Sequence, residues 1–119
     1  MLPTIGITSG DPAGIGLEVL LKSIPPLLQS ANWILYTSRG VFEANRTLFA
    51  PDISHCWLEG SDLPASRAAL WLKAVDRNAG TAEALTYLAQ ASDDVLSGRI
   101  AAIVTGPVSK AAIGPAFRG

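Results

Sequence analysis

Short apolar runs alternate with longer segments of helical periodicity along this chain. Residues 5–7 form the first run and predict a buried strand, and apolar side chains at helical spacing predict a helix over residues 16–24. Pro25 and Pro26 end that helix, because proline lacks the N–H donor and clashes with the preceding turn. A further apolar run at residues 33–36 predicts a second strand. The chain therefore opens as strand, helix and strand.

The middle of the chain repeats this alternation less clearly. A helix is expected over residues 41–48, and a turn-rich segment then surrounds an apolar stretch at residues 56–58 that predicts a lesser strand. Residues 66–77 are ambiguous: propensity favours a helix, but a strand or an irregular segment is also compatible with the pattern.

The last predicted elements are a longer helix and a strand. Thr81 suits the N-cap of a helix over residues 82–96, and residues 97–98, Ser-Gly, suit its C-terminal end. The β-branched run at residues 100–104 predicts a buried strand. Strands and helices that alternate in this rhythm predict an α/β fold, a three-layer αβα domain with a mostly parallel sheet.

A glycine-rich turn joins the first strand to the first helix. It contains Gly10, Asp11, Gly14 and Gly16, a spacing that matches neither G-x-x-x-x-G-K-[ST] nor G-x-G-x-x-G. Glycines let backbone N–H groups come close to a ligand, and the amino end of the following helix favours a phosphate or carboxylate. The alternative is a tight turn in which the glycines serve packing alone.

A second polar loop follows the strand at residues 100–104. Thr105 offers a hydroxyl, Gly106 gives access to backbone donors, and Lys110 brings a cation that suits phosphate or carboxylate. The alternative here is a surface lysine without a ligand. Both polar loops would lie beyond the carboxyl ends of parallel strands, where ligands bind in such sheets.

Composition narrows the class of protein. The chain has 119 residues, 49% hydrophobic and 16% charged, which suffices for one domain with a core and argues against disorder. A net charge of −1 without a basic run makes nucleic acid an unexpected partner. The sequence shows neither an apolar run as long as a membrane span nor a signal-peptide pattern. We expect a cytoplasmic protein, in keeping with the single cysteine.

The histidine and cysteine content predicts neither a metal site nor a nucleophile. His55 is the only histidine, whereas metal sites need three or four ligands, so we expect a structural or merely exposed role. Cys56 has no obvious base nearby in sequence and is expected to act as a small buried hydrophobe.

Three motifs resemble those of one enzyme family. Residues 6–18, GITSGDPAGIGLE, resemble the amino-terminal signature GDPAGIGPE of the 4-hydroxythreonine-4-phosphate dehydrogenases, with Leu17 where that family commonly has proline. Residues 98–110 end in TGPVSK and resemble the family's T-[AG]-P-[IV]-x-K pattern. Residues 78–81, NAGT, resemble the family's lead-in to the helix before that strand.

The resemblance implies the amino-terminal third of a longer two-domain enzyme with an isocitrate/isopropylmalate-dehydrogenase-like fold. Residues 1–119 would form a single α/β domain or part of one. Such an enzyme is a homodimer that uses NAD and a divalent metal (Zn, Mg or Co) to oxidise and decarboxylate 4-phosphooxy-threonine in pyridoxal phosphate synthesis. Related enzymes act on other four-carbon sugar-acid phosphates. The family's next motif, GHTE or GQTE, and its three metal-binding histidines have no counterpart here, so we expect the short chain alone to be inactive.

The resemblance and the loop positions together suggest roles for the two polar loops. The glycine-rich turn is assigned to the cofactor: Gly10, Asp11, Gly14 and Gly16. The second loop is assigned to the phosphorylated substrate: Thr105, Gly106 and Lys110. Two other classes of protein stay open, namely a phosphate-binding α/β module without chemistry and a remnant or interaction domain whose exposed sheet edge pairs with a partner chain.

Overall fold

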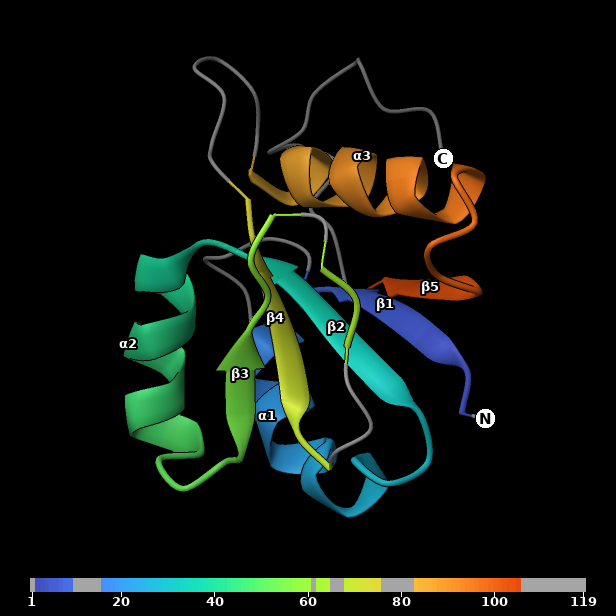
Figure 1. Cartoon of the computed structure of the whole chain (residues 1–119). Helices are drawn as coiled ribbons and strands as arrows, with labels where there is room; N and C mark the ends of the chain where they lie inside the picture. Colours follow the sequence, from blue (N-terminus) through green and yellow to red (C-terminus); the bar gives the residue numbers. More distant parts are fainter. Residues whose placement is uncertain (1, 10–15, 61, 65–67, 76–82, 106–119) are drawn as a thin grey trace.

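A computed structural model describes residues 2–9, 16–60, 62–64, 68–75 and 83–105 (Figure 1). Within them, strands and helices alternate along most of the chain, as the apolar pattern predicts. In chain order the elements are β1 (Thr4–Thr8), α1 (Gly16–Ser23), the 3₁₀ turn η1 (Pro25–Leu27), β2 (Asn32–Thr37), α2 (Arg39–Phe49), β3 (His55–Trp57), β4 (Leu70–Ala74), α3 (Glu83–Leu96) and β5 (Ala102–Thr105).

The described strands form one parallel sheet in the order β3-β4-β2-β1-β5 (Figure 1). β1 therefore pairs with β2 on one side and with β5, the last strand of the chain, on the other. β4 lies between β2 and β3, so β3 does not pair with the strand that precedes it in sequence. Since all pairs are parallel, the carboxyl ends of all the described strands lie at the same edge of the sheet.

Helices cover both faces of this sheet and create two separate cores. On one face, α1 and α2 pack against alternate residues of the central strands, and the buried members of this core include Leu21, Leu35, Phe42, Leu70 and Leu72. On the other face, α3 covers a second core that includes Ile34, Tyr36, Trp71, Tyr87 and Ala91. The three-layer αβα arrangement predicted from the sequence is thus confirmed.

The ambiguous segment 66–77 contains a strand, β4, so the helix that its propensity favours is wrong. Leu70 and Leu72 point into the core under α1 and α2, whereas Trp71 points into the core under α3. All three are buried, which a strand in the middle of a covered sheet requires. Burial on both faces removes the alternation of apolar and polar residues that would have marked a strand in the sequence.

The helix ends agree closely with the sequence signals. α1 ends at Ser23, and the two following prolines begin η1 instead of continuing the helix. At the other end of the chain, Gly98 has a φ of 79°, and its N–H donates to the carbonyl oxygen of Val95 at 3.0 Å. A positive φ favours glycine, so Ser97-Gly98 is the C-terminal end of α3 that was predicted. The proposed N-cap, Thr81, lies outside the described residues.

The lone histidine and cysteine have structural surroundings in β3. The His55 ring packs against the Phe42 ring with centroids 5.3 Å apart, and its Nδ1 lies 2.9 Å from the carbonyl oxygen of Ile53. Cys56 is half-buried and packs against the core beneath α3. His55 therefore has a structural role, as expected, whereas Cys56 packs against the core but is only partly buried.

Candidate functional site

Hydroxyl side chains gather at the carboxyl ends of three adjacent strands. β1 ends in Thr8 and is followed by Ser9, β2 ends in Thr37 and is followed by Ser38, and β5 ends in Thr105. The pairing register sets Thr8 directly opposite Thr105 and one position away from Thr37. We call these five residues the carboxyl edge.

Burial and hydrogen bonding differ sharply among the residues of the carboxyl edge. Thr37 is fully buried, and its hydroxyl donates to the carbonyl oxygen of Ser38 at 3.5 Å. The Ser38 hydroxyl accepts a hydrogen bond from the backbone N–H of Val41 at 3.4 Å. Ser9 is 2% exposed, and its Oγ has no hydrogen-bond partner in the described part of the chain. The edge therefore contains one buried hydroxyl group that the described protein leaves unsatisfied.

Two helices begin at this same edge. The chain runs from β1 to α1, whose first residue is Gly16, and from β2 through Ser38 to α2, whose first residue is Arg39. Helix amino ends carry partial positive charge and favour anions. The neighbouring strands β2 and β4 are followed by helices on opposite faces of the sheet: α2 follows β2 and α3 follows β4. The two connections therefore separate at the carboxyl ends of these strands. Ligands bind at such points in open α/β sheets.

The structure describes two of the seven site residues predicted from the sequence. Gly16 is the first residue of α1, and Thr105 is the exposed last residue of β5. Both lie where the carboxyl edge was expected. The other five lie outside the described residues: Gly10, Asp11, Gly14, Gly106 and Lys110.

Sequence reasoning did not assign Ser9, Thr37 or Ser38 to a site. A signal was nevertheless present, because the pair Thr-Ser occurs directly after an apolar run at residues 8–9 and again at residues 37–38. In adjacent parallel strands, such repeated strand ends lie side by side.

A buried charged cluster lies below the edge, on the face covered by α3. The Tyr36 hydroxyl donates to Oδ2 of Asp94 at 2.6 Å, and Nζ of Lys73 donates to the same oxygen at 2.9 Å. These residues come from β2, β4 and α3, and the Lys73 ammonium lies 5.9 Å from the centroid of the Tyr36 ring. The cluster ties α3 to two central strands.

Within this cluster, the pKa of Tyr36 is raised and the pKa of Asp94 is lowered. Burial, the hydrogen bond to Asp94 and the negative charge of Asp94 raise the pKa of Tyr36 far above its ordinary value. Burial also raises the pKa of Asp94, but hydrogen bonds from Tyr36 and Lys73 and the charges of Lys73 and Arg99 outweigh it and lower that pKa overall. Asp94 is therefore ionised and Tyr36 protonated near neutral pH. These protonation states suit a cluster that holds α3 against the sheet better than one that transfers protons.

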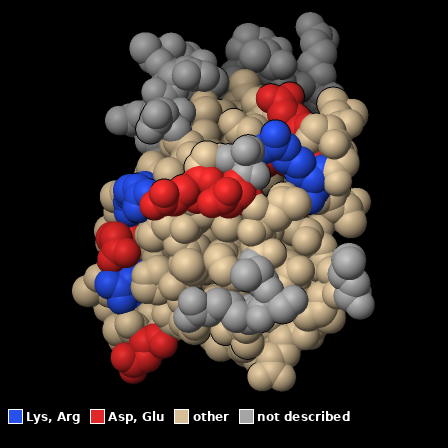
Figure 2. Space-filling view, in the orientation of Figure 1, with Lys and Arg blue, Asp and Glu red and all other residues tan. Residues whose placement is uncertain are grey.

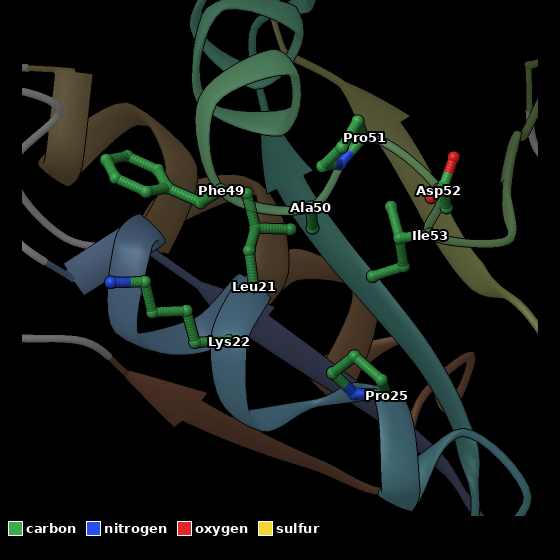
Figure 3. Close-up of a pocket in the computed structure, with 8 residues that line it drawn as sticks. All are labelled: Leu21, Lys22, Pro25, Phe49, Ala50, Pro51, Asp52 and Ile53. Carbon is green, nitrogen blue, oxygen red and sulfur yellow. The ribbon is translucent and has the colours of Figure 1, made fainter.

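The described residues also enclose a pocket at the opposite end of the sheet (Figure 3). It has a volume of about 460 Å³ and lies between the ends of α1 and α2. Its lining residues are Leu21, Lys22, Pro25, Phe49, Ala50, Pro51, Asp52 and Ile53. The Lys22 ammonium already pairs with Glu18 at 2.7 Å and lies 5.3 Å from the Phe49 ring centroid. The pocket thus offers a mainly apolar wall far from the carboxyl edge.

The surface charge on the side shown in Figure 2 is mixed. Acidic and basic side chains alternate along α2, where Arg46 pairs with Glu43 at 2.8 Å, and a wide neighbouring area carries no charge. The part of the chain that the structure describes contains no group of three or more side chains suited to hold a metal ion. No helix among the described residues has the length and apolar character needed to cross a bilayer.

Comparison with known proteins extends the resemblance seen in the three motifs. The 4-hydroxythreonine-4-phosphate dehydrogenase of Xanthomonas campestris pv. campestris is 33% identical over 123 aligned positions, which cover 95% of this chain and 38% of that protein. The enzyme of the same name from Synechococcus sp. (strain RCC307) is 35% identical over 115 positions, covering 91% of this chain and 34% of that protein. The chain is related to the 4-hydroxythreonine-4-phosphate dehydrogenases. It spans little more than a third of the length of these relatives.

Solved structures agree in fold. A 4-hydroxythreonine-4-phosphate dehydrogenase from Klebsiella pneumoniae superposes with a TM-score of 0.76 at 24% identity, over 94% of this chain and 38% of that one. The corresponding structure from Burkholderia phymatum has a TM-score of 0.75 over the same shares. This likeness confirms the predicted α/β fold class. No family model matches the chain.

Proposed function

We propose that this chain is part of a metal- and NAD-dependent dehydrogenase that oxidises and decarboxylates 4-phosphooxy-threonine in pyridoxal phosphate synthesis. The observation that carries this proposal is the similarity to 4-hydroxythreonine-4-phosphate dehydrogenases over 95% of the chain. The likeness in fold and the polar carboxyl edge agree with it. On this proposal the complete enzyme is a cytoplasmic homodimer.

The proposed reaction removes a hydride from the carbon that carries the substrate's secondary hydroxyl and releases the proton of that hydroxyl to solvent. The β-keto acid that results then loses carbon dioxide. NAD, when bound, accepts the hydride. Within this chain, the turn that contains Gly10, Asp11, Gly14 and Gly16 would approach the cofactor. Thr105, Gly106 and Lys110 would hold the phosphate of the substrate by hydrogen bonds and charge.

The carboxyl edge suits an anionic part of the cofactor or substrate, since it combines the amino ends of α1 and α2 with the unsatisfied hydroxyl of Ser9. The described residues do not fit a divalent metal, because they bring no three ligating side chains together. We therefore assign no step of the reaction to a metal held by these residues.

The test is to express the open reading frame that encodes this chain, with whatever follows residue 119, and to measure NAD reduction with 4-phosphooxy-threonine and a divalent metal. The 119-residue chain is assayed alongside and is expected to show no turnover above background. We expect Asp11→Ala to raise the KM for NAD and Lys110→Ala to raise the KM for the phosphorylated substrate, each by about tenfold or more. Lys22→Ala is the matched control, because Lys22 lies on α1, where its ammonium pairs with Glu18 and lies over the Phe49 ring, far from the carboxyl edge.

Wild-type kinetics in both variants would remove the proposed roles from Asp11 and Lys110. Turnover by the 119-residue chain would contradict its expected inactivity. Assays with other four-carbon sugar-acid phosphates decide the substrate: a higher kcat/KM for one of them would assign the chain to a related dehydrogenase.

A non-catalytic phosphate-binding module is the second candidate, and the unsatisfied Ser9 hydroxyl at the carboxyl edge favours it. Such a module needs only the two polar loops on one sheet edge. Phosphate binding by the expressed protein without any NAD reduction would favour the module over the enzyme.

A further inference from the structure

Ser9 holds a buried polar atom that the fold does not satisfy. The residue is 2% exposed, and its Oγ has no hydrogen-bond partner among the described residues. Buried hydroxyl groups are normally paired, and the few exceptions in folded proteins call for an explanation such as a missing ligand. Among the described residues, only Ser9 and Trp71 have such an atom, and Trp71 is the second residue of β4, away from the carboxyl end of that strand.

The position of Ser9 points to an anionic ligand. It directly follows β1, at the sheet edge where α1 and α2 begin. Helix amino ends favour anions, and a serine hydroxyl can donate a hydrogen bond to an anionic oxygen. The Thr37 hydroxyl already donates to the carbonyl oxygen of Ser38, and the Ser38 hydroxyl accepts from the N–H of Val41, whereas neither role of the Ser9 hydroxyl is met among the described residues.

We propose that the Ser9 hydroxyl donates a hydrogen bond to an oxygen of a phosphate group bound at the carboxyl edge. This inference rests on the proposed function for the source of that phosphate, which is the substrate or the pyrophosphate of NAD. It adds a ligand-contacting residue that the sequence motifs did not single out.

The experiment is a titration of the protein expressed from the complete reading frame with inorganic phosphate, 4-phosphooxy-threonine and NAD in separate arms, read by isothermal calorimetry and by the ligand-induced rise in Tm. Ser9→Ala removes the hydroxyl. We expect its Kd for the bound phosphate compound to rise by about tenfold or more, because a hydrogen bond to a charged group is lost. We expect the Tm of the ligand-free variant to equal or exceed that of the wild type, because no hydrogen bond within the described protein is lost.

Ser30→Ala is the control, since Ser30 is exposed and lies before β2, at the amino end of the sheet. It should leave both the Kd and the Tm unchanged. The arm in which Ser9→Ala weakens binding identifies the source of the phosphate.

Two outcomes would overturn the inference. One is a Ser9→Ala variant with unchanged affinity in every arm, which would make Ser9 a structural residue. The other is a wild-type protein, from the complete reading frame, that responds to none of the three compounds. The dehydrogenase proposal is tested separately. It fails if the protein expressed from the complete reading frame does not reduce NAD, even when Ser9→Ala weakens phosphate binding.

Discussion

Gly6 marks the position in β1 where the second core leaves no room for a side chain. A Cβ at this position would lie 2.7 Å from Cδ1 of Ile100 and 3.0 Å from Cε1 of Tyr36. The end of the Ile100 side chain can move, but the hydrogen bond to Asp94 holds the Tyr36 ring. We expect Gly6→Ala to lower the free energy of unfolding by about 1–3 kcal/mol, measured by urea denaturation.

Gly40 is the matched control for this prediction. It lies in α2, and a Cβ there would meet nothing within 4 Å. Gly40→Ala should therefore raise stability, by about 0.5–1 kcal/mol, because alanine favours the helix. The Ile100→Val change removes Cδ1 and should recover part of the loss when combined with Gly6→Ala. Equal stabilities for the two single alanine variants would contradict the steric account.

The Lys73–Asp94 ion pair should contribute far more to the free energy of unfolding than the exposed ion pair on α1. The side chains of Lys73 and Asp94 are 18% and 8% exposed, whereas those of Lys22 and Glu18 are 57% and 36% exposed. Lys73→Met leaves a buried carboxylate without its cation, and we expect a loss of about 3–5 kcal/mol in the free energy of unfolding. Lys22→Met should change it by less than about 1 kcal/mol.

The same ion pair predicts the response to acid. The pKa of Asp94 in the folded protein lies below its ordinary value, so its contribution to stability is present above the unfolded pKa and is lost as the pH falls through the folded one. The wild type should thus lose stability below about pH 4. In Lys73→Met the folded pKa of Asp94 rises toward its unfolded value, so the loss of stability on acidification should be smaller than in the wild type. Identical profiles of stability against pH for the two proteins would refute this explanation.

At the scale of elements, Ser38 connects a strand end to a helix start. It is the N-cap of α2, and its N–H also lies 3.4 Å from the Tyr87 hydroxyl on α3. Ser38→Ala should cost about 1 kcal/mol of stability, because the N–H of Val41 loses its partner. Ser38→Asp keeps an acceptor at the N-cap and should retain most of the stability. A Ser38→Asp variant as unstable as Ser38→Ala would show that the cap contributes little.

Most elements could be predicted from the sequence, because their signals are local. The prolines after α1, the Ser97-Gly98 end of α3 and the apolar run of β2 each act over a few residues. β4 is the exception. Its burial on both faces depends on helices far away in sequence, so residues 66–77 contain no local pattern that distinguishes strand from helix.

At the scale of the molecule, the parallel sheet was predictable but the strand order was not. Alternation of strands and helices indicates a parallel sheet, whereas the place of β4 between β2 and β3 depends on tertiary packing alone. For the site, Gly16 and Thr105 lie at the sheet edge that the sequence indicated, and their roles in ligand binding stay predictions. The unsatisfied hydroxyl of Ser9 could not be predicted, because burial and hydrogen-bond partners are properties of the folded chain.

The strand order also constrains the sequence of events during folding. β3 is synthesised before β4, yet among the described strands it pairs only with β4. The place beside β2 therefore stays open until residues 70–74 reach it, and β3 joins the sheet through β4, either together with it or after it. β5 likewise joins β1 across almost the whole length of the chain, which makes its pairing entropically expensive. We therefore expect the sheet to grow outward from the β1–β2 pair. β3 should stay unpaired until β4, which is synthesised after it, is available.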